Sequence, residues 1–127
     1  MAKSILIIDD DQLVVKTLSR YLKTYGYKIE TAVSGEEAIA KSETMPFDLI
    51  VSDIRMPGMN GLETLKKLRS IAQDKHRINI PEIIITGYAS DENHKEAENM
   101  GIVNYIYKPF DVSVFIDAVK KALTKKE

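Results

Sequence analysis

Short apolar runs alternate with longer stretches of helical periodicity along the chain. Four of the runs are continuous, which is typical of strands buried on both faces of a parallel sheet, and a fifth, more polar candidate follows the first run. In chain order the candidate strands span residues 5–8, 27–32, 49–51, 83–85 and 103–107.

Each candidate strand is followed by a segment whose apolar residues recur every three to four positions, as on one face of a helix. Asp11 and Ser34 stand where N-caps belong, Glu37 would complete a capping box with Ser34, and Gly26 and Gly101 are helix stops. The positions expected to form the apolar faces of the five helices are Leu13, Thr17, Leu18, Tyr21 and Leu22; Ala38 and Ile39; Leu62, Leu65, Leu68 and Ile71; Ala97 and Met100; and Val114, Phe115, Ala118, Val119 and Leu123.

Five alternations of strand and helix predict an α/β fold, with right-handed crossovers and a doubly wound parallel sheet covered on both faces. No linker rich in Pro, Gly or Ser divides the 127 residues, and we find no internal repeat. We therefore expect residues 1–127 to form one (βα)5 domain.

Composition and charge exclude several classes of function. The net charge is −1 with no clustered basic excess, so direct nucleic-acid binding is not predicted. The chain has no cysteine, which removes disulfides, thiolate metal sites and a cysteine nucleophile. No apolar run reaches the ~18 residues of a membrane helix, and the first run is too short for a signal peptide. We expect a cytoplasmic protein that does not enter a membrane.

Acidic residues follow two of the predicted strands. Asp9, Asp10 and Asp11 come directly after the first strand, and Asp53 comes after the third. In doubly wound sheets ligands bind at the carboxyl ends of the strands. If the first and third strands are neighbours, each pair of carboxylates about 4 Å apart would repel by about 4 kcal/mol at an effective dielectric constant near 20. Such a cluster requires a cation, and Mg²⁺ prefers oxygen ligands of this kind; Asp11 is better explained as a helix cap.

The other two strand ends carry groups that complement an anion. Thr86 ends the fourth strand, and its hydroxyl could donate to a phosphoryl oxygen where the small Gly87 leaves room for approach. Lys108 ends the fifth strand, before Pro109, and supplies a positive charge. Taken singly, Thr86 could also be a buried β-branched residue, and Lys108 a surface lysine.

Four segments that contain these residues resemble the response-regulator receiver domain family, of the chemotaxis-regulator-like type. They span residues 7–11, 52–61, 84–87 and 105–110, and read Ile-Ile-Asp-Asp-Asp, Ser-Asp-Ile-Arg-Met-Pro-Gly-Met-Asn-Gly, Ile-Ile-Thr-Gly and Tyr-Ile-Tyr-Lys-Pro-Phe. Their order and spacing make the match specific over essentially the whole chain. The resemblance implies a flavodoxin-like sheet with strand order 2-1-3-4-5.

The resemblance also implies a role for each strand-end residue. Asp53 would be the phosphoacceptor. Asp10 and Asp53 would bind Mg²⁺ directly, together with the backbone carbonyl of Arg55, while Asp9 would hold the ion through water; Mn²⁺ would substitute for Mg²⁺. Thr86 and Lys108 would contact the phosphoryl oxygens.

Two further features follow from the resemblance. The Lys108–Pro109 peptide bond would be cis, a conformation found almost only before proline. Tyr105 would turn inward when Thr86 is drawn towards the phosphoryl group, although a half-buried strand aromatic is the simpler interpretation of that residue.

The resemblance implies a switch of a two-component or phosphorelay system and not a conventional enzyme. The phosphoryl group would come from a sensor histidine kinase or a histidine phosphotransfer protein, and the domain would assist its own phosphorylation and dephosphorylation. The fourth helix, fifth strand and fifth helix would then act on a downstream partner or output domain, which the sequence does not identify, or form a phosphorylation-dependent homodimer.

Two positions near the acceptor are hypothesised to tune the lifetime of the phosphorylated state. Arg55 and Tyr88 each lie two residues after a site residue, and their bulk would hinder the attacking water. Plain surface variation is the alternative. His76 and His94 lie in polar segments without paired spacing, so a metal-ligand role is not predicted for them.

Three other functions share some of these sequence features. The acids at residues 9–11, with Thr86 and Lys108, also fit the first motifs of haloacid dehalogenase-like phosphatases, but only Asp111 and Asp117 follow where a further acidic motif is needed. A flavin-binding module shares the fold class, but its phosphate site would require donors where this chain has acids. A purely structural interaction domain would neither bind Mg²⁺ nor accept a phosphoryl group.

Overall fold

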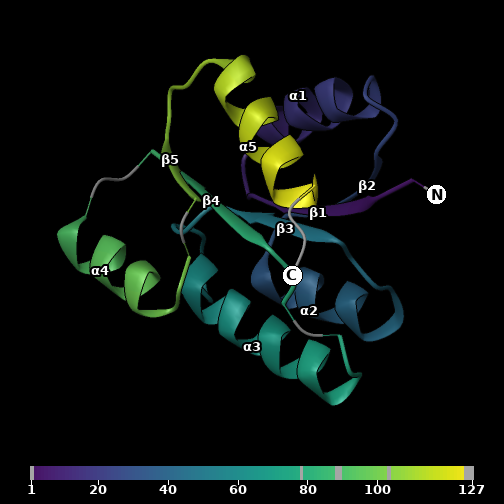
Figure 1. Ribbon diagram of the computed structural model, residues 1–127. Helices are drawn as coiled ribbons and strands as arrows, with labels where there is room; N and C mark the ends of the chain where they lie inside the picture. Colours follow the sequence, from purple (N-terminus) through teal and green to yellow (C-terminus); the bar gives the residue numbers. More distant parts are fainter. Residues whose placement is uncertain (1, 78, 88–89, 103, 125–127) are drawn as a thin grey trace.

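Strands and helices alternate along the chain in the computed structural model, which describes residues 2–77, 79–87, 90–102 and 104–124 (Figure 1). The strands are β1 (Ser4–Ile8), β2 (Lys28–Ala32), β3 (Leu49–Ser52), β4 (Glu82–Thr86) and β5 (Asn104–Tyr107). The helices are α1 (Gln12–Lys23), α2 (Gly35–Thr44), α3 (Gly61–Asp74), α4 (Asp91–Asn99) and α5 (Val112–Thr124). Val103, the first residue of the predicted fifth strand, lies outside the described residues.

The five strands form one parallel sheet in the order β2-β1-β3-β4-β5. The predicted doubly wound α/β fold and its strand order are therefore confirmed. The register pairs Ile8 of β1 with Ser52 of β3, and Ser52 with Ile84 of β4. Asp9 follows Ile8 and Asp53 follows Ser52, which are paired across the two strands. The two aspartates therefore lie side by side where β1 and β3 end.

Helices cover both faces of the sheet, with α1 and α5 on one side and α2 and α3 on the other (Figure 1). Side chains alternate between these layers because successive residues of a strand point to opposite faces. In β1, Leu6 and Ile8 pack in the cluster with α2 and α3, whereas Ile5 and Ile7 pack in the cluster with α1 and α5. The central strands β1, β3 and β4 are buried on both faces, which explains their continuous apolar runs, whereas the edge strands β2 and β5 are only partly buried.

The buried faces of α1 and α5 differ from the prediction. The residues of α1 that face the sheet are Val15, Leu18 and Leu22, while the predicted core positions Leu13, Thr17 and Tyr21 are exposed. Of the apolar positions predicted for α5, Val114 is exposed, and the buried face is made by Phe115, Ile116 and Val119. Both helices begin with apolar residues at neighbouring positions, so periodicity alone allowed two stripes, and packing against the sheet selected one of them.

The capping interactions also differ in part from the prediction. Ser34 Oγ accepts the backbone N–H of Glu37 at 3.1 Å, but the Glu37 carboxylate accepts the N–H of Val33 rather than that of Ser34. The complete capping box lies at the start of α3. There Asn60 Oδ1 accepts the N–H of Glu63, and Glu63 Oε1 accepts the N–H of Asn60.

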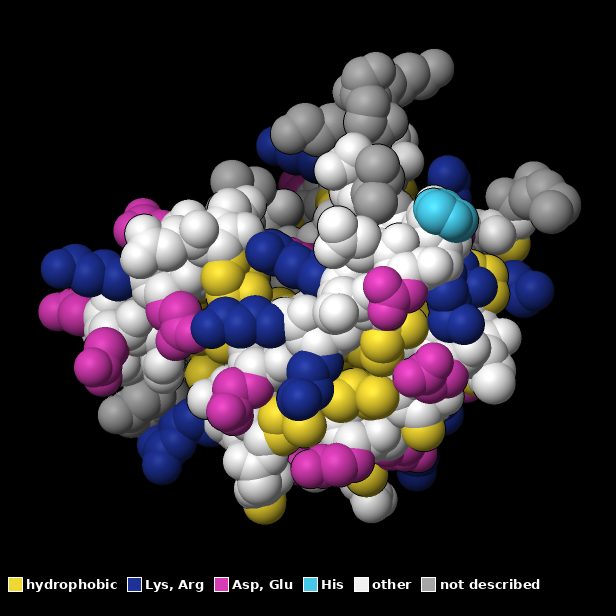
Figure 2. Space-filling model, turned by 90° about the horizontal axis from the view of Figure 1, so that it is seen from below, with side chains coloured by type: hydrophobic (Ala, Val, Ile, Leu, Met, Phe, Trp, Pro, Cys, Tyr) yellow, Lys and Arg dark blue, Asp and Glu magenta, His cyan; other side chains and the backbone are white. Residues whose placement is uncertain are grey.

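The surface seen from below in Figure 2 carries charges of both signs. Lys and Arg side chains alternate there with Asp and Glu side chains, and no large area of one sign is present on this face. Among the helices of the described residues, none is long and apolar enough to cross a membrane.

Candidate functional site

Three carboxylates meet at the carboxyl edge of the sheet. Asp9 and Asp10 follow β1, Asp53 follows β3, and one carboxylate oxygen from each lies within 4.8 Å of the others. Asp9 is fully buried and Asp53 is 7% exposed, whereas Asp10 is exposed. The cluster therefore opens to solvent on the side of Asp10.

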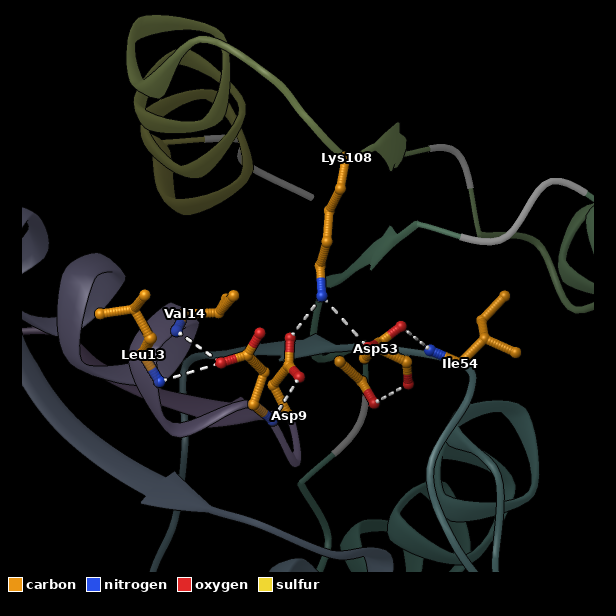
Figure 3. A network of polar contacts seen from close by, with 8 residues as sticks. Asp9, Leu13, Val14, Asp53, Ile54 and Lys108 are labelled. Carbon is orange, nitrogen blue, oxygen red and sulfur yellow. Dashed lines mark hydrogen bonds and ion pairs between the residues drawn. The ribbon is translucent and has the colours of Figure 1, made fainter.

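Lys108 reaches this cluster from the end of β5 (Figure 3). Its Nζ lies 2.9 Å from Asp9 Oδ2 and 3.2 Å from Asp53 Oδ2, so a single ammonium donates to both buried carboxylates. The Lys108–Pro109 peptide bond is cis. Lysine suits this position because its long side chain can reach past the end of β4, the strand that lies between β3 and β5.

Backbone N–H groups hold the other oxygens of the two buried carboxylates. Asp9 Oδ1 accepts the N–H of Asp11 at 2.9 Å, and Asp53 Oδ1 accepts the N–H of Ile54 at 2.7 Å (Figure 3). Asp11 is the N-cap of α1, as expected, because its carboxylate accepts the N–H of Leu13 at 3.0 Å. These contacts fix the two carboxylates but leave lone pairs free, since a carboxylate offers about four acceptor positions.

The electrostatics of the cluster favour a further cation. Burial raises the pKa of the Asp9 carboxyl, and the neighbouring charge of Asp53 adds to this; the hydrogen bonds from Asp11 and Lys108 oppose the effect without cancelling it. Burial would lower the pKa of Lys108, but its hydrogen bonds to Asp9 and Asp53 and their charges outweigh burial and raise it. Lys108 is therefore a permanent cation beside carboxylates whose charge it compensates only in part.

Thr86 and Gly87 complete the edge of the sheet. Thr86 is fully buried at the end of β4, and its carbonyl accepts the N–H of Lys108 at 2.7 Å. A methyl group placed on Gly87 would meet the Lys108 side chain at 3.9 Å, an ordinary contact distance, so there is free space beside Gly87. Arg55 is exposed in the connection between β3 and α3, two residues after Asp53. Tyr88 lies outside the described residues.

Two neighbours of the site were not anticipated from the sequence. Gly61, the first residue of α3, lies so close to the end of β3 that a Cβ there would stand 1.8 Å from the Asp53 carbonyl oxygen. The signal for this approach was a glycine directly after the N-cap Asn60. His94 stacks on Tyr105, and no sequence signal pointed to this contact because α4 is almost entirely polar.

The fold and the acidic edge place the chain among α/β domains that bind ligands at the carboxyl ends of their strands. A family model, the response regulator receiver domain, matches residues 5–120, and the chain belongs to that family. Members of this family are signalling switches of two-component systems rather than conventional enzymes.

Relatives of known sequence or structure agree with this assignment. The chain is 35% identical over 116 residues to the transcriptional regulatory protein FixJ of Rhizobium meliloti. The aligned region covers 91% of this chain and 54% of that protein. A CheY-like receiver domain protein from Methanospirillum hungatei superposes with a TM-score of 0.88 at 36% identity, covering 97% of this chain and 94% of that chain.

A third relative was solved in a modified state. It is a response regulator protein from Burkholderia pseudomallei with a phosphorylated aspartic acid, a calcium ion and citrate. It shares 29% identity and a TM-score of 0.80, and the match covers 94% of this chain and 68% of that chain. Among the curated relatives it matches, the chain spans from about a quarter to just over half of their length.

Proposed function

We propose that this chain accepts a phosphoryl group on Asp53 and changes the surface formed by α4, β5 and α5 in response. The observation that supports this most strongly is the ammonium of Lys108, which bridges the buried carboxylates of Asp9 and Asp53. A nucleophilic carboxylate, a fixed cation and a group of acidic oxygens are the parts that phosphoryl transfer requires.

The donor set fits a hard divalent cation. Asp9, Asp10 and Asp53 provide three negative charges against the one positive charge of Lys108, so the cluster carries a formal excess of two. We infer that Asp10, Asp53 and the backbone carbonyl of Arg55 hold Mg²⁺ or Mn²⁺, with Asp9 acting through water. When bound, the ion neutralises charge on the oxygens of the transferring group. The relative with a phosphorylated aspartate was solved with calcium, another divalent ion that prefers oxygen ligands.

The transfer step follows from the positions of these residues. A carboxylate oxygen of Asp53 attacks phosphorus in line, the bond from phosphorus to the donor's imidazole nitrogen breaks, and its electron pair stays on that nitrogen. The product is an acyl phosphate. Lys108 shifts its donated hydrogen bonds to the phosphoryl oxygens as negative charge moves there, and the Thr86 hydroxyl donates a second hydrogen bond. As Thr86 moves towards the phosphoryl group, the Tyr105 ring turns inward.

The partners belong to the same proposal. A sensor histidine kinase or a histidine phosphotransfer protein would donate the phosphoryl group, and hydrolysis of the acyl phosphate would reset the switch. The curated relatives are named transcriptional regulatory proteins and are longer than this chain. We propose that the switched surface acts on an output domain or on a separate target protein. A phosphorylation-dependent homodimer, and slower hydrolysis caused by the bulk of Arg55 and Tyr88, also stay predictions.

The proposal is tested by phosphorylation with acetyl phosphate, read by intact mass with and without Mg²⁺. We expect an added phosphoryl mass that depends on Mg²⁺ and that disappears in Asp53→Asn. Asp111→Asn is the matched control, because Asp111 is an exposed aspartate outside the cluster, and it should be phosphorylated like the wild type.

Two outcomes would contradict the proposal. An adduct that persists in Asp53→Asn and maps to Asp9 would favour a phosphatase-like nucleophile. If no adduct forms, beryllofluoride with Mg²⁺ becomes the second probe, because hydrolysis can outrun detection of the acyl phosphate. No response to either reagent would leave only an interaction domain on the same fold.

A further inference from the structure

The helix α4 contributes little to the buried core within the described part of the chain. The helix is strongly polar and buries a single residue, Ala97. Figure 1 shows α4 at the margin of the molecule, beyond β4 and β5. Lys66 of α3 pairs with Glu96 at 2.7 Å across the surface, but both side chains are about half exposed, and exposed pairs of this kind contribute little.

The second contact of α4 is aromatic. The His94 imidazole stacks on the ring of Tyr105, with ring centroids 4.6 Å apart and an angle of 21° between the planes. Tyr107 approaches the same imidazole edge-on, with its hydroxyl 3.5 Å from His94 Nδ1. One residue of α4 therefore contacts both tyrosines of β5, and the stacked geometry is one that aromatic pairs prefer.

Tyr105 requires support in the position where it is seen. Its hydroxyl is buried and has no hydrogen-bond partner among the described residues. Burial raises the pKa of Tyr105, and the nearby Tyr107 and Asp53 add to this effect. An unpartnered buried hydroxyl costs free energy, so packing of the ring has to compensate for it. The ring packs against the cluster that includes Ile84 and Ala97, and it stacks on His94.

We propose that His94 is a positioning residue, which holds Tyr105 in its half-buried, stacked position and thereby sets how readily the domain adopts its phosphorylated conformation. The inference rests on the proposed function, in which Tyr105 turns inward as Thr86 moves towards the phosphoryl group. By thermodynamic linkage, a contact that stabilises the inward ring also strengthens binding at the phosphoryl site by the same factor. Loss of an aromatic pair corresponds to about a 2- to 10-fold change in an equilibrium constant.

The test uses beryllofluoride with Mg²⁺ as a stable phosphoryl analogue, titrated by NMR. The chain has two histidines, so the imidazole resonances of His94 and His76 can be assigned with one variant. We expect the His94 resonance to shift when the analogue binds, because the analogue raises the occupancy of the stacked Tyr105 ring and so changes its ring current at His94, while His76 in the α3–β4 connection stays unaffected. His94→Ala should weaken binding about 2- to 10-fold.

Two further variants separate positioning from a general effect on α4. His94→Phe keeps a stacking ring and should restore binding to near the wild-type value, whereas Lys95→Ala removes an exposed neighbour in the same helix and should change nothing. Amide spectra establish that each variant is folded. Equal affinity in wild type and His94→Ala, or no rescue by His94→Phe, would overturn the role of His94 alone. Absence of binding in the wild type would overturn the phosphoacceptor proposal, and this inference with it.

Discussion

Among single residues, Asp9 shows what it costs to assemble the acidic cluster. Its carboxylate is fully buried, and its pKa is raised above the ordinary value of 3.8, chiefly by burial. The stabilising effect of protonated Asp9 is therefore present below that value and is lost as the pH rises through the raised pKa. At neutral pH without a divalent ion, the ionised Asp9 destabilises the folded state relative to the unfolded chain.

We therefore expect Asp9→Asn to raise the free energy of unfolding at pH 7 in EDTA by on the order of 1 kcal/mol. Urea denaturation of the wild type and the variant measures this difference, with the exposed Asp111→Asn as a control that should change little. Saturating Mg²⁺ should stabilise the wild type more than Asp9→Asn. If Asp9→Asn instead lowers the free energy of unfolding in EDTA, the ion pair between Asp9 and Lys108 in the wild type outweighs the cost of burying the carboxylate.

Among the secondary-structure elements, α3 is the one whose start is most tightly tied to the acceptor. Gly61 donates its N–H to the Ile54 carbonyl at 2.8 Å, and a side chain at this residue would collide with the Asp53 carbonyl. The atoms that the added Cβ would meet are backbone atoms of Asp53 and Ile54, so relief of the collision requires α3 or the end of β3 to move. We expect Gly61→Ala to destabilise the protein by about 2–3 kcal/mol and to displace Asp53 from Lys108.

The matched control is Gly87→Ala, where the added methyl group meets the Lys108 side chain at an ordinary 3.9 Å. That variant should stay within about 0.5 kcal/mol of the wild type. Thermal unfolding followed by circular dichroism compares the two variants, and acetyl phosphate labelling shows whether the acceptor is displaced. Similar stabilities for Gly61→Ala and wild type would show that the end of β3 adapts to the added methyl group.

The helices also show where sequence patterns lose resolution. The existence and order of all five were predictable, because most have apolar periodicity and a cap or stop signal, and the short, polar α4 is followed by the stop residue Gly101. The buried stripe of α1 was not, since Leu13, Val14 and Val15 are all apolar and only packing decides that Val15 faces the sheet. The contact of His94 with Tyr105 was also beyond sequence reasoning, because it depends on how far α4 approaches β5.

For the molecule as a whole, the pattern of the sequence predicted the parallel sheet and the gathering of the strand-end residues, whereas the strand order was implied only by the family resemblance. Continuous apolar runs indicate a parallel sheet, and a parallel sheet brings its carboxyl ends to one edge, so residues 99 positions apart, Asp9 and Lys108, come within hydrogen-bond distance. The sequence could not show which carboxylate oxygens Lys108 contacts, or that Asp9 is completely buried while Asp10 is exposed. Those details depend on side-chain packing at the edge.

The same sheet divides the interior into two cores, and this division has a consequence for switching. Ile7 packs with α1 and α5, while Ile8 packs with α2 and α3 and with the cluster that supports Tyr105. Ile7→Val and Ile8→Val should each cost about 0.5–1.5 kcal/mol. Although the two residues are adjacent in sequence, the double variant should lose the sum of the two values to within about 0.5 kcal/mol.

Chemical denaturation of the wild type, both single variants and the double variant completes the cycle. Additivity would mean that the cluster beside Tyr105 can repack without disturbing the layer of α1 and α5, so that a change at α4 and β5 stays local to one side of the sheet. A coupling energy above about 1 kcal/mol would instead show that the sheet transmits strain between the layers. In that case, phosphorylation of Asp53 would be expected to alter both faces of the domain.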